Sequence, residues 1–231
     1  MKELLEKLIG LIPAYFDALL PLLTVPKHFI AERLSSNESA MQKALIFLAV
    51  SFLIGWLLKI PLSHGDPLLE LGPDGVFVLI CVMMYGGVLY LAWRIAGGRV
   101  EIQKFLAIHF YYSGVLKLLE TGTYVGTMGT IRLVDPALYK KIYDAAYGGN
   151  IVPFLSKSSE QLLVSWGYRL SLCALLVGYG VMLIWIFIGW GAYRALTRLS
   201  KVRSFMAGLL FLVFCFPVAA LTLVIANALV K

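Results

Sequence analysis

The stretch ALIFLAVSFLIGWLLKI, Ala44–Ile60, carries only one charged side chain, Lys59, which stands next to its end. A helix that crosses the hydrocarbon core of a bilayer, about 30 Å thick, needs about 20 mostly apolar residues, because its backbone polar groups find no water there. Ala44–Ile60 approaches that length between Lys43 and Pro61. The stretch therefore predicts a membrane-spanning helix.

The composition of the whole chain agrees with that prediction. Of 231 residues, 60% are hydrophobic and 14% are charged, and the mean hydropathy is +0.85. Soluble domains carry about 25% charged residues. The composition indicates an integral membrane protein.

Three further stretches are long and apolar enough to span a bilayer: residues 76–93, 170–193 and 205–230. Residues 76–93 read VFVLICVMMYGGVLYLAW. A fifth, residues 105–131, is more polar, with His109, Ser113, Lys117 and Glu120 at steps of three and four. Such steps place these side chains on one helical face, which we expect to turn into the bundle. The predicted fold class is all-α: a polytopic membrane helical bundle of five transmembrane helices at about 44–60, 76–93, 105–131, 170–193 and 205–230.

Positive charge is concentrated on alternate connections. Lys and Arg are frequent before Ala44, in Arg94–Lys104 and in Arg194–Arg203, whereas Pro61–Gly75 has none. By the positive-inside rule the N-terminus is then cytoplasmic and the C-terminus extracytoplasmic, in a cell inner membrane, which requires an odd number of spans. The net charge of +7 would face anionic lipid headgroups, and nucleic acid is not an expected partner.

The first 43 residues form a predicted cytoplasmic or interfacial amphipathic segment, followed by a transmembrane domain over 44–231. In LLEKLIGLIPAYFDALLPLL, acids and lysines alternate with leucines, which is typical of a helix in the membrane interface and not of a cleaved signal. We expect Pro21 and Pro26 to break this helix. Beyond the break, Lys27 and His28 would reach lipid phosphate while Phe29 stays among acyl chains; a simple loop is the alternative.

Helix signals recur on both sides of the membrane. Ser35 with Glu38 has the spacing of a capping box. In the long outer connection, Asp135 is a predicted N-cap and Gly148 a predicted helix stop. Tyr139, Tyr143 and Tyr147 recur every four residues between them, and we expect this stripe to anchor a surface helix at headgroup level, with a binding site as the alternative.

Residues for catalysis are sparse. Cys81, Cys173 and Cys215 lie mid-span, and no nucleophile or metalloprotease motif is present. His64 with Asp66 and Glu70 could hold a metal, but a polar loop without metal is the expected state. The prediction is a protein that is not an enzyme and uses no cofactor or metal.

The segments VPKHFIAERL and WRIAGGRVEIQKFLAIHFYYSG resemble the Yip family of multi-pass membrane proteins, in their bacterial form. In that family a proline and an aromatic pair precede the first helix, and a Gly-Gly turn followed by a basic or polar residue links helices two and three. The matching positions are Pro26, Phe29, Gly97, Gly98 and Phe105. The resemblance implies five helices, a cytoplasmic N-terminus and an adaptor role. Eukaryotic members are linked to small GTPases and vesicle traffic.

The expected function is a non-enzymatic adaptor, scaffold or accessory subunit of a membrane transport or trafficking complex. Lys27, His28, Phe29, Gly97, Gly98 and Arg99 are the candidate interface and lipid contacts. Partners would be membrane lipids with anionic headgroups and another membrane protein or a second copy. Glycines in three predicted spans allow close helix contacts, which we expect within one bundle, with self-association as the alternative. The alternative is a small transporter or channel subunit that uses the polar face formed by His109, Ser113, Lys117 and Glu120. An intramembrane enzyme is a third, less supported class.

Overall fold

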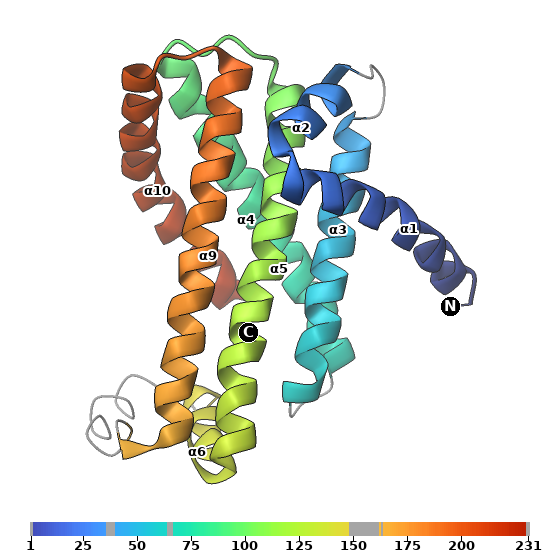
Figure 1. Cartoon of the computed structure of the whole chain (residues 1–231), viewed down its shortest axis with the longest axis vertical. Coiled ribbons are helices and arrows are strands. Elements are labelled where there is room, and N and C mark those ends of the chain that lie inside the picture. The colour runs from blue at the N-terminus through green and yellow to red at the C-terminus, as the bar shows by residue number, and fades with distance from the viewer. Residues whose placement is uncertain (1, 36–39, 64–66, 148–161, 163, 230–231) are drawn as a thin grey trace.

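A computed structural model describes the chain except for residues 1, 36–39, 64–66, 148–161, 163 and 230–231. Every regular element among the described residues is a helix (Figure 1). The elements in chain order are α1 (Lys2–Thr24), α2 (Pro26–Ser35), α3 (Ala40–Lys59), the short 3₁₀ helix η1 (Ile60–Leu62), α4 (Pro67–Ile95), α5 (Ile102–Val134), α6 (Pro136–Tyr147), α9 (Trp166–Thr197) and α10 (Lys201–Leu229). The predicted all-α fold class is confirmed.

Four of these helices are long and apolar enough to cross a membrane: Ala40–Leu62, Leu71–Ile95, Trp166–Thr197 and Lys201–Thr222. They correspond to the four apolar stretches of the sequence, and each begins at least four residues before the predicted span. A helix can continue beyond its apolar stretch, because its backbone hydrogen bonds continue and the polar side chains there can lie at the membrane interface.

The more polar fifth helix, α5, occupies the centre of the bundle between α3 and α9 (Figure 1). After its exposed first residues, α5 is enclosed from Phe105 onward, and Phe105, Ala107, Ile108 and Phe110 expose at most 1% of their surface. A helix that is covered by neighbouring helices needs less apolar surface than a helix that faces lipid. The prediction that its polar face turns inward holds for His109, which is bonded within the bundle.

Small residues allow α5 to approach its neighbours. A Cβ atom at Gly178 of α9 would collide with the Thr123 side chain of α5. On the opposite side, a Cβ atom at Gly55 of α3 would lie 2.8 Å from Thr121 Oγ1. Helix α10 packs against α4 in a second helix pair. The glycines therefore serve packing within one bundle, as dispersion contacts between close helices require.

Helix α1 continues through Pro13 and Pro21, so the prediction that Pro21 breaks it is wrong. The Val25 amide donates to the Pro21 carbonyl at 2.8 Å, which keeps the final turn helical. Packing compensates for the proline, since Leu22 is fully buried beside it. The break falls at Pro26, which begins α2.

Residues of the N-terminal segment share one core with the bundle. The Tyr15 ring stacks on Phe47 of α3 at 4.8 Å, and its hydroxyl lies 3.0 Å from Ser51 Oγ. The Phe29 ring of α2 meets Tyr111 of α5 edge-on at 5.2 Å. Aromatic contacts of this kind fix both helices to α3 and α5.

At the opposite end of the bundle, α6 folds against the end of α5 (Figure 1). Tyr139 and Tyr143 are 4% and 7% exposed, so the prediction that they anchor α6 in headgroups is wrong. Leu62 and Ile131 supply an apolar protein surface for both rings, and the Tyr139 hydroxyl donates to the Leu62 carbonyl at 2.8 Å. The side chain of Tyr147 lies outside the described residues, as does Gly148.

Asp135 is the N-cap of α6, as predicted. Its Oδ1 accepts from the Leu138 amide at 3.0 Å, and its Oδ2 accepts from the Ser165 hydroxyl at 2.8 Å. These two bonds, the Leu138 amide first, lower the pKa of the Asp135 carboxyl. Asp135 thus joins the start of α6 to the start of α9.

Candidate functional site

His109 is held between α4 and α9. Its Nε2 lies 3.0 Å from the Val82 carbonyl, and its Nδ1 lies 3.2 Å from the Tyr193 hydroxyl. A carbonyl can only accept, so Nε2 carries the proton and Nδ1 accepts from Tyr193. This assignment of protons follows from the bonding pattern and describes a neutral imidazole with both nitrogens in use. Ser113 Oγ lies 3.4 Å from Nε2 and completes the group.

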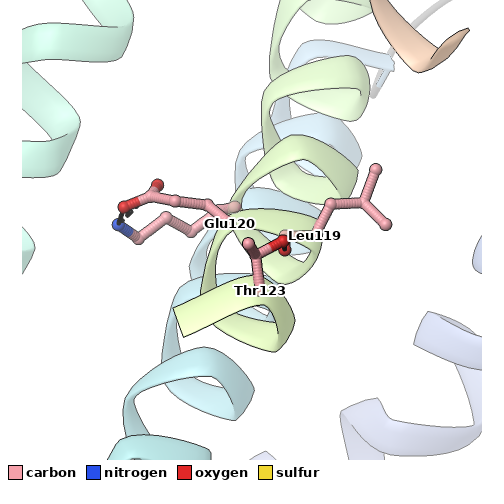
Figure 2. Close-up of polar contacts among 4 residues, drawn as sticks. Leu119, Glu120 and Thr123 are labelled. Carbon is pink, nitrogen blue, oxygen red and sulfur yellow. Dashed lines mark hydrogen bonds and ion pairs between the residues drawn. The ribbon is translucent and has the colours of Figure 1, made fainter. Parts of the chain in front are cut away.

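The other two members of the predicted polar face pair with each other. Lys117 Nζ lies 3.0 Å from Glu120 Oε2, and Figure 2 draws this ion pair beside the bond from the Thr123 hydroxyl to the Leu119 carbonyl. The Lys117 side chain is 17% exposed and that of Glu120 is 55% exposed. The candidate polar face thus divides into two pairs. His109 and Ser113 form an inner pair, and Lys117 and Glu120 form an ion pair one to two helical turns beyond Ser113.

A cavity of about 530 Å³ lies between α4, α5, α9 and α10, and His109 and Ser113 are part of its wall. The wall is apolar and aromatic and includes no Lys, Arg, Asp or Glu; its residues are Leu89, His109, Tyr112, Ser113, Leu116, Trp185, Ile186, Phe187, Gly189, Trp190, Tyr193, Phe205, Gly208, Leu209, Phe211 and Leu212. This volume falls within the range of about 300–1,000 Å³ that is typical of small-molecule sites. We refer to it as the lateral cavity.

Tyr112 lines the lateral cavity and was missed by the sequence reasoning. It is 6% exposed, and among the described residues its hydroxyl has no hydrogen-bond partner. Its ring lies 4.9 Å from that of Trp185, whose indole N–H donates to the Tyr112 carbonyl at 3.1 Å. The aromatic run in FYYSG, directly after His109, is the signal that could have directed attention to it.

The glycine pair after α4 forms the predicted tight turn. Gly97 has φ +97°, a conformation that is energetically unfavourable for residues with a Cβ atom. The Gly97 amide donates to the Arg94 carbonyl at 3.1 Å, and the Gly98 amide donates to the Trp93 carbonyl at 2.8 Å. These bonds satisfy two of the carbonyls in the last turn of α4. Arg99 is exposed just beyond. The turn lies at the same end of the bundle as the α9–α10 connection (Figure 1).

The candidate contacts of α2 have different environments. Lys27 and His28 are exposed, and His28 Nδ1 lies 3.9 Å from Glu32. Phe29 is 3% exposed and packs on Tyr111, so the expectation that its ring stays among acyl chains is wrong. The Phe29 ring makes more dispersion contacts in the densely packed protein core beside Tyr111 than it would make with acyl chains. Phe29 therefore attaches α2 to the bundle, and of the three candidate contacts on α2, Lys27 and His28 are exposed.

Among the described residues, no three His, Cys, Asp or Glu side chains group as metal ligands. His64 and Asp66, which the sequence suggested with Glu70, lie outside the described residues, as does the Glu70 side chain. The partner of Ser35 in the predicted capping box, Glu38, also lies outside them.

Comparisons with protein-family models, with curated proteins and with solved structures found no match. The resemblance to the Yip family therefore stays a prediction.

Proposed function

We propose that the chain is a non-enzymatic membrane adaptor or accessory subunit, of the Yip type, which holds another membrane protein through α1. The supporting observation is an apolar stripe on α1 that the bundle leaves uncovered. Ile12, Phe16, Leu20 and Leu23 are 42%, 47%, 61% and 45% exposed. They recur at steps of four, four and three, so they share one face of the helix.

The opposite face of α1 is already used. Tyr15, Ala18 and Leu22 are buried and pack with α3 and its neighbours. α1 crosses α3, and its N-terminal part extends away from the bundle (Figure 1). A rigid helix held on one face and apolar on the other is suited to docking in the groove of a partner helix pair.

The proposal includes a cell inner membrane and an orientation in it. Arg94, Arg99, Arg194 and Lys201 flank the α4–α5 and α9–α10 turns. By the positive-inside rule these turns and α2 face the cytoplasm, and the C-terminus faces outward. Each exposed cation there would contribute about 1 kcal/mol of attraction to anionic headgroups.

The competing function, a small transporter or channel subunit, has less support from the same residues. A polar path for ions needs groups that are free to exchange partners. His109 uses both ring nitrogens within the bundle, and Lys117 is paired with Glu120. These bonds favour a structural role for the α5 polar face.

Site-specific photo-crosslinking tests the adaptor proposal. A benzophenone side chain would replace Phe16 or Leu20 on the stripe, and Leu176 or Phe187, which are 71% and 74% exposed on α9, as controls. We expect both stripe positions to give the same protein adduct in membranes, and the controls to give lipid adducts. An adduct of twice the chain mass would identify the partner as a second copy. Lipid adducts alone at all four positions would contradict the proposal.

A further inference from the structure

The lateral cavity opens toward the hydrocarbon core between α9 and α10. Phe187 on α9 is 74% exposed, and Phe205 and Leu212 on α10 are 64% and 60% exposed, so the rim is apolar. The two helices are joined by a short turn, yet α9 packs on α5 and α10 packs on α4. An occupant can therefore enter sideways from the bilayer.

The wall of the cavity is suited to a hydrocarbon chain. It includes no Lys, Arg, Asp or Glu. His109 is bonded to the Tyr193 hydroxyl and the Val82 carbonyl, and the Trp185 indole N–H donates to the Tyr112 carbonyl. A charged headgroup in this cavity would lose its hydration without gaining a counter-charge, whereas an acyl chain has no hydration to lose.

The cavity covers the depth of one leaflet of the bilayer. Helix α10 begins at Lys201, and the wall residues Phe205 and Leu212 stand four and eleven residues further along it. At 1.5 Å per residue, these two residues lie about 6 Å and about 16 Å beyond Lys201. Half of a hydrocarbon core is about 15 Å thick, so an acyl chain that begins near Lys201 would extend along the cavity.

Two cations continue the cavity-lining faces of α9 and α10 toward the turn that joins them. On α10, Lys201 precedes Phe205 and Leu209 at steps of four, and on α9, Arg194 follows Trp190 by four residues. Residues at such steps share one face of a helix. Arg194 and Lys201 therefore flank the end of the cavity that lies nearest the turn.

No acidic side chain nearby in the sequence balances these two cations. Residues 161–231 include no Asp or Glu. Within the described part of the chain, no carboxylate forms an ion pair with Arg194 or Lys201. Arg203 instead reaches the α4–α5 turn, since its guanidinium would lie 3.5 Å from a Cβ atom at Gly97. Arg194 and Lys201 are thus available to an anion, and lipid phosphate is the anion that a bilayer supplies at this level.

We propose that the lateral cavity binds one anionic phospholipid, whose phosphate lies between Arg194 and Lys201 and one of whose acyl chains fills the cavity. The second acyl chain remains among the bilayer lipids. The site selects an anionic lipid because a zwitterionic headgroup brings its own cation to the two basic side chains. This proposal does not depend on the adaptor function, because α1 takes no part in the site.

Native mass spectrometry of the protein in detergent tests the headgroup site. The probes are dioleoylphosphatidylglycerol and dioleoylphosphatidylcholine, which have the same chains. We expect the first phosphatidylglycerol adduct to saturate at a concentration about tenfold lower than the phosphatidylcholine adduct. Arg194→Gln combined with Lys201→Gln should weaken phosphatidylglycerol binding about thirtyfold and remove this preference. Lys43→Gln combined with Arg99→Gln is the matched control, since it removes the same charge from two exposed cations outside the cavity, and should bind as wild type does.

Quenching of tryptophan fluorescence tests the acyl-chain site, because Trp185 and Trp190 line the cavity. Phosphatidylglycerol with brominated acyl chains should quench wild type saturably. Leu209→Phe should fill the cavity, in which Leu209 is a wall residue, and abolish the saturable part. Leu176→Phe on the exposed surface of α9 is its control and should be quenched as wild type is.

Four results would overturn the proposal. They are equal binding of the two lipids, equal losses in the two double variants, unchanged quenching in Leu209→Phe, and competition by glycerophosphoglycerol, which has no acyl chains, at the affinity of the whole lipid. Because Arg194 and Lys201 lie at the end of the bundle and have no ion pair within the described structure, the result of their replacement stands even if Leu209→Phe fails to fold.

Discussion

Two tyrosine hydroxyls close to His109 differ in their bonding. The Tyr193 hydroxyl is bonded to His109 Nδ1, whereas the Tyr112 hydroxyl has no partner among the described residues. The two rings lie 5.9 Å apart. At the scale of single residues, the polar atoms of the bundle interior therefore divide into those that hold helices together and those without a partner among the described residues, of which the Tyr112 hydroxyl is one.

Replacing each of these tyrosines by phenylalanine should separate the two roles. Tyr193→Phe leaves His109 Nδ1 buried without a donor and should cost about 1–3 kcal/mol of unfolding free energy. Tyr112→Phe removes no bond within the described structure and should leave the unfolding free energy unchanged or raise it. Unfolding by denaturant in detergent measures both. Equal losses in the two variants would show that the Tyr112 hydroxyl has a partner.

The glycine turn gives a second prediction at this scale. Gly97→Val and Gly98→Val should both destabilise the protein, because Gly97 has φ +97° and a Cβ atom at Gly98 would lie 2.8 Å from the Trp93 carbonyl oxygen. Positive φ alone costs about 1–2 kcal/mol. Gly87→Ala in α4 is the control, since a Cβ atom there meets nothing within 4 Å. Valine variants at both positions that accumulate and melt as wild type would contradict the turn.

Asp135 should make the packing of α6 depend on pH. Its folded pKa is lowered by the Leu138 amide and the Ser165 hydroxyl, so its contribution to stability is full above the unfolded pKa of about 4 and is lost as pH falls through the folded pKa. Hydrogen exchange of α6 should be constant above about pH 5, after correction for the intrinsic rate, and rise below about pH 4. Asp135→Asn should flatten this dependence. A protection profile that is the same in both proteins would remove the capping role.

At the scale of elements, the sequence predicts the apolar helices well, because a hydrophobic stretch depends on local composition alone. Leu71–Ile95 contains the predicted span 76–93 for that reason. The predicted helix break at Pro21 was wrong because tertiary packing compensates for a proline inside a helix. The predicted membrane anchor of Tyr139 and Tyr143 was wrong because the protein itself buries both rings. The lateral cavity could not be predicted, since its wall joins residues of four helices whose contacts no local pattern encodes.

The α1–α2 elbow yields a prediction at the same scale. Phe29→Ser should loosen α2 regardless of lipid, by about 3–5 kcal/mol locally, because the ring is buried against Tyr111. Lys27→Glu should loosen it only in membranes with anionic lipid at low salt, since Lys27 is exposed. Hydrogen exchange of α1 and α2 in nanodiscs with and without anionic lipid measures both. Lipid dependence of the Phe29→Ser effect would place the ring at the membrane.

At the scale of the whole molecule, two of the helices are longer than the hydrocarbon core of a bilayer is thick. α5 has 33 residues and α9 has 32, so each is about 50 Å long, against a hydrocarbon core of about 30 Å. Their far ends, with α6 and η1, form a second small core around Ile131, Tyr139 and Leu62. α5 therefore has the length to cross the bilayer as a fifth helix and to reach this outer core.

Topology mapping tests the five-span bundle most directly. Single reporters would be placed in the turn at Gly97 and after Lys231, using an enzyme that is active only on one side of the membrane. A crossing by α5, together with the four apolar helices, predicts a cytoplasmic reporter at Gly97 and an extracytoplasmic one after Lys231. Reporters on the same side of the membrane at both positions would contradict the crossing by α5.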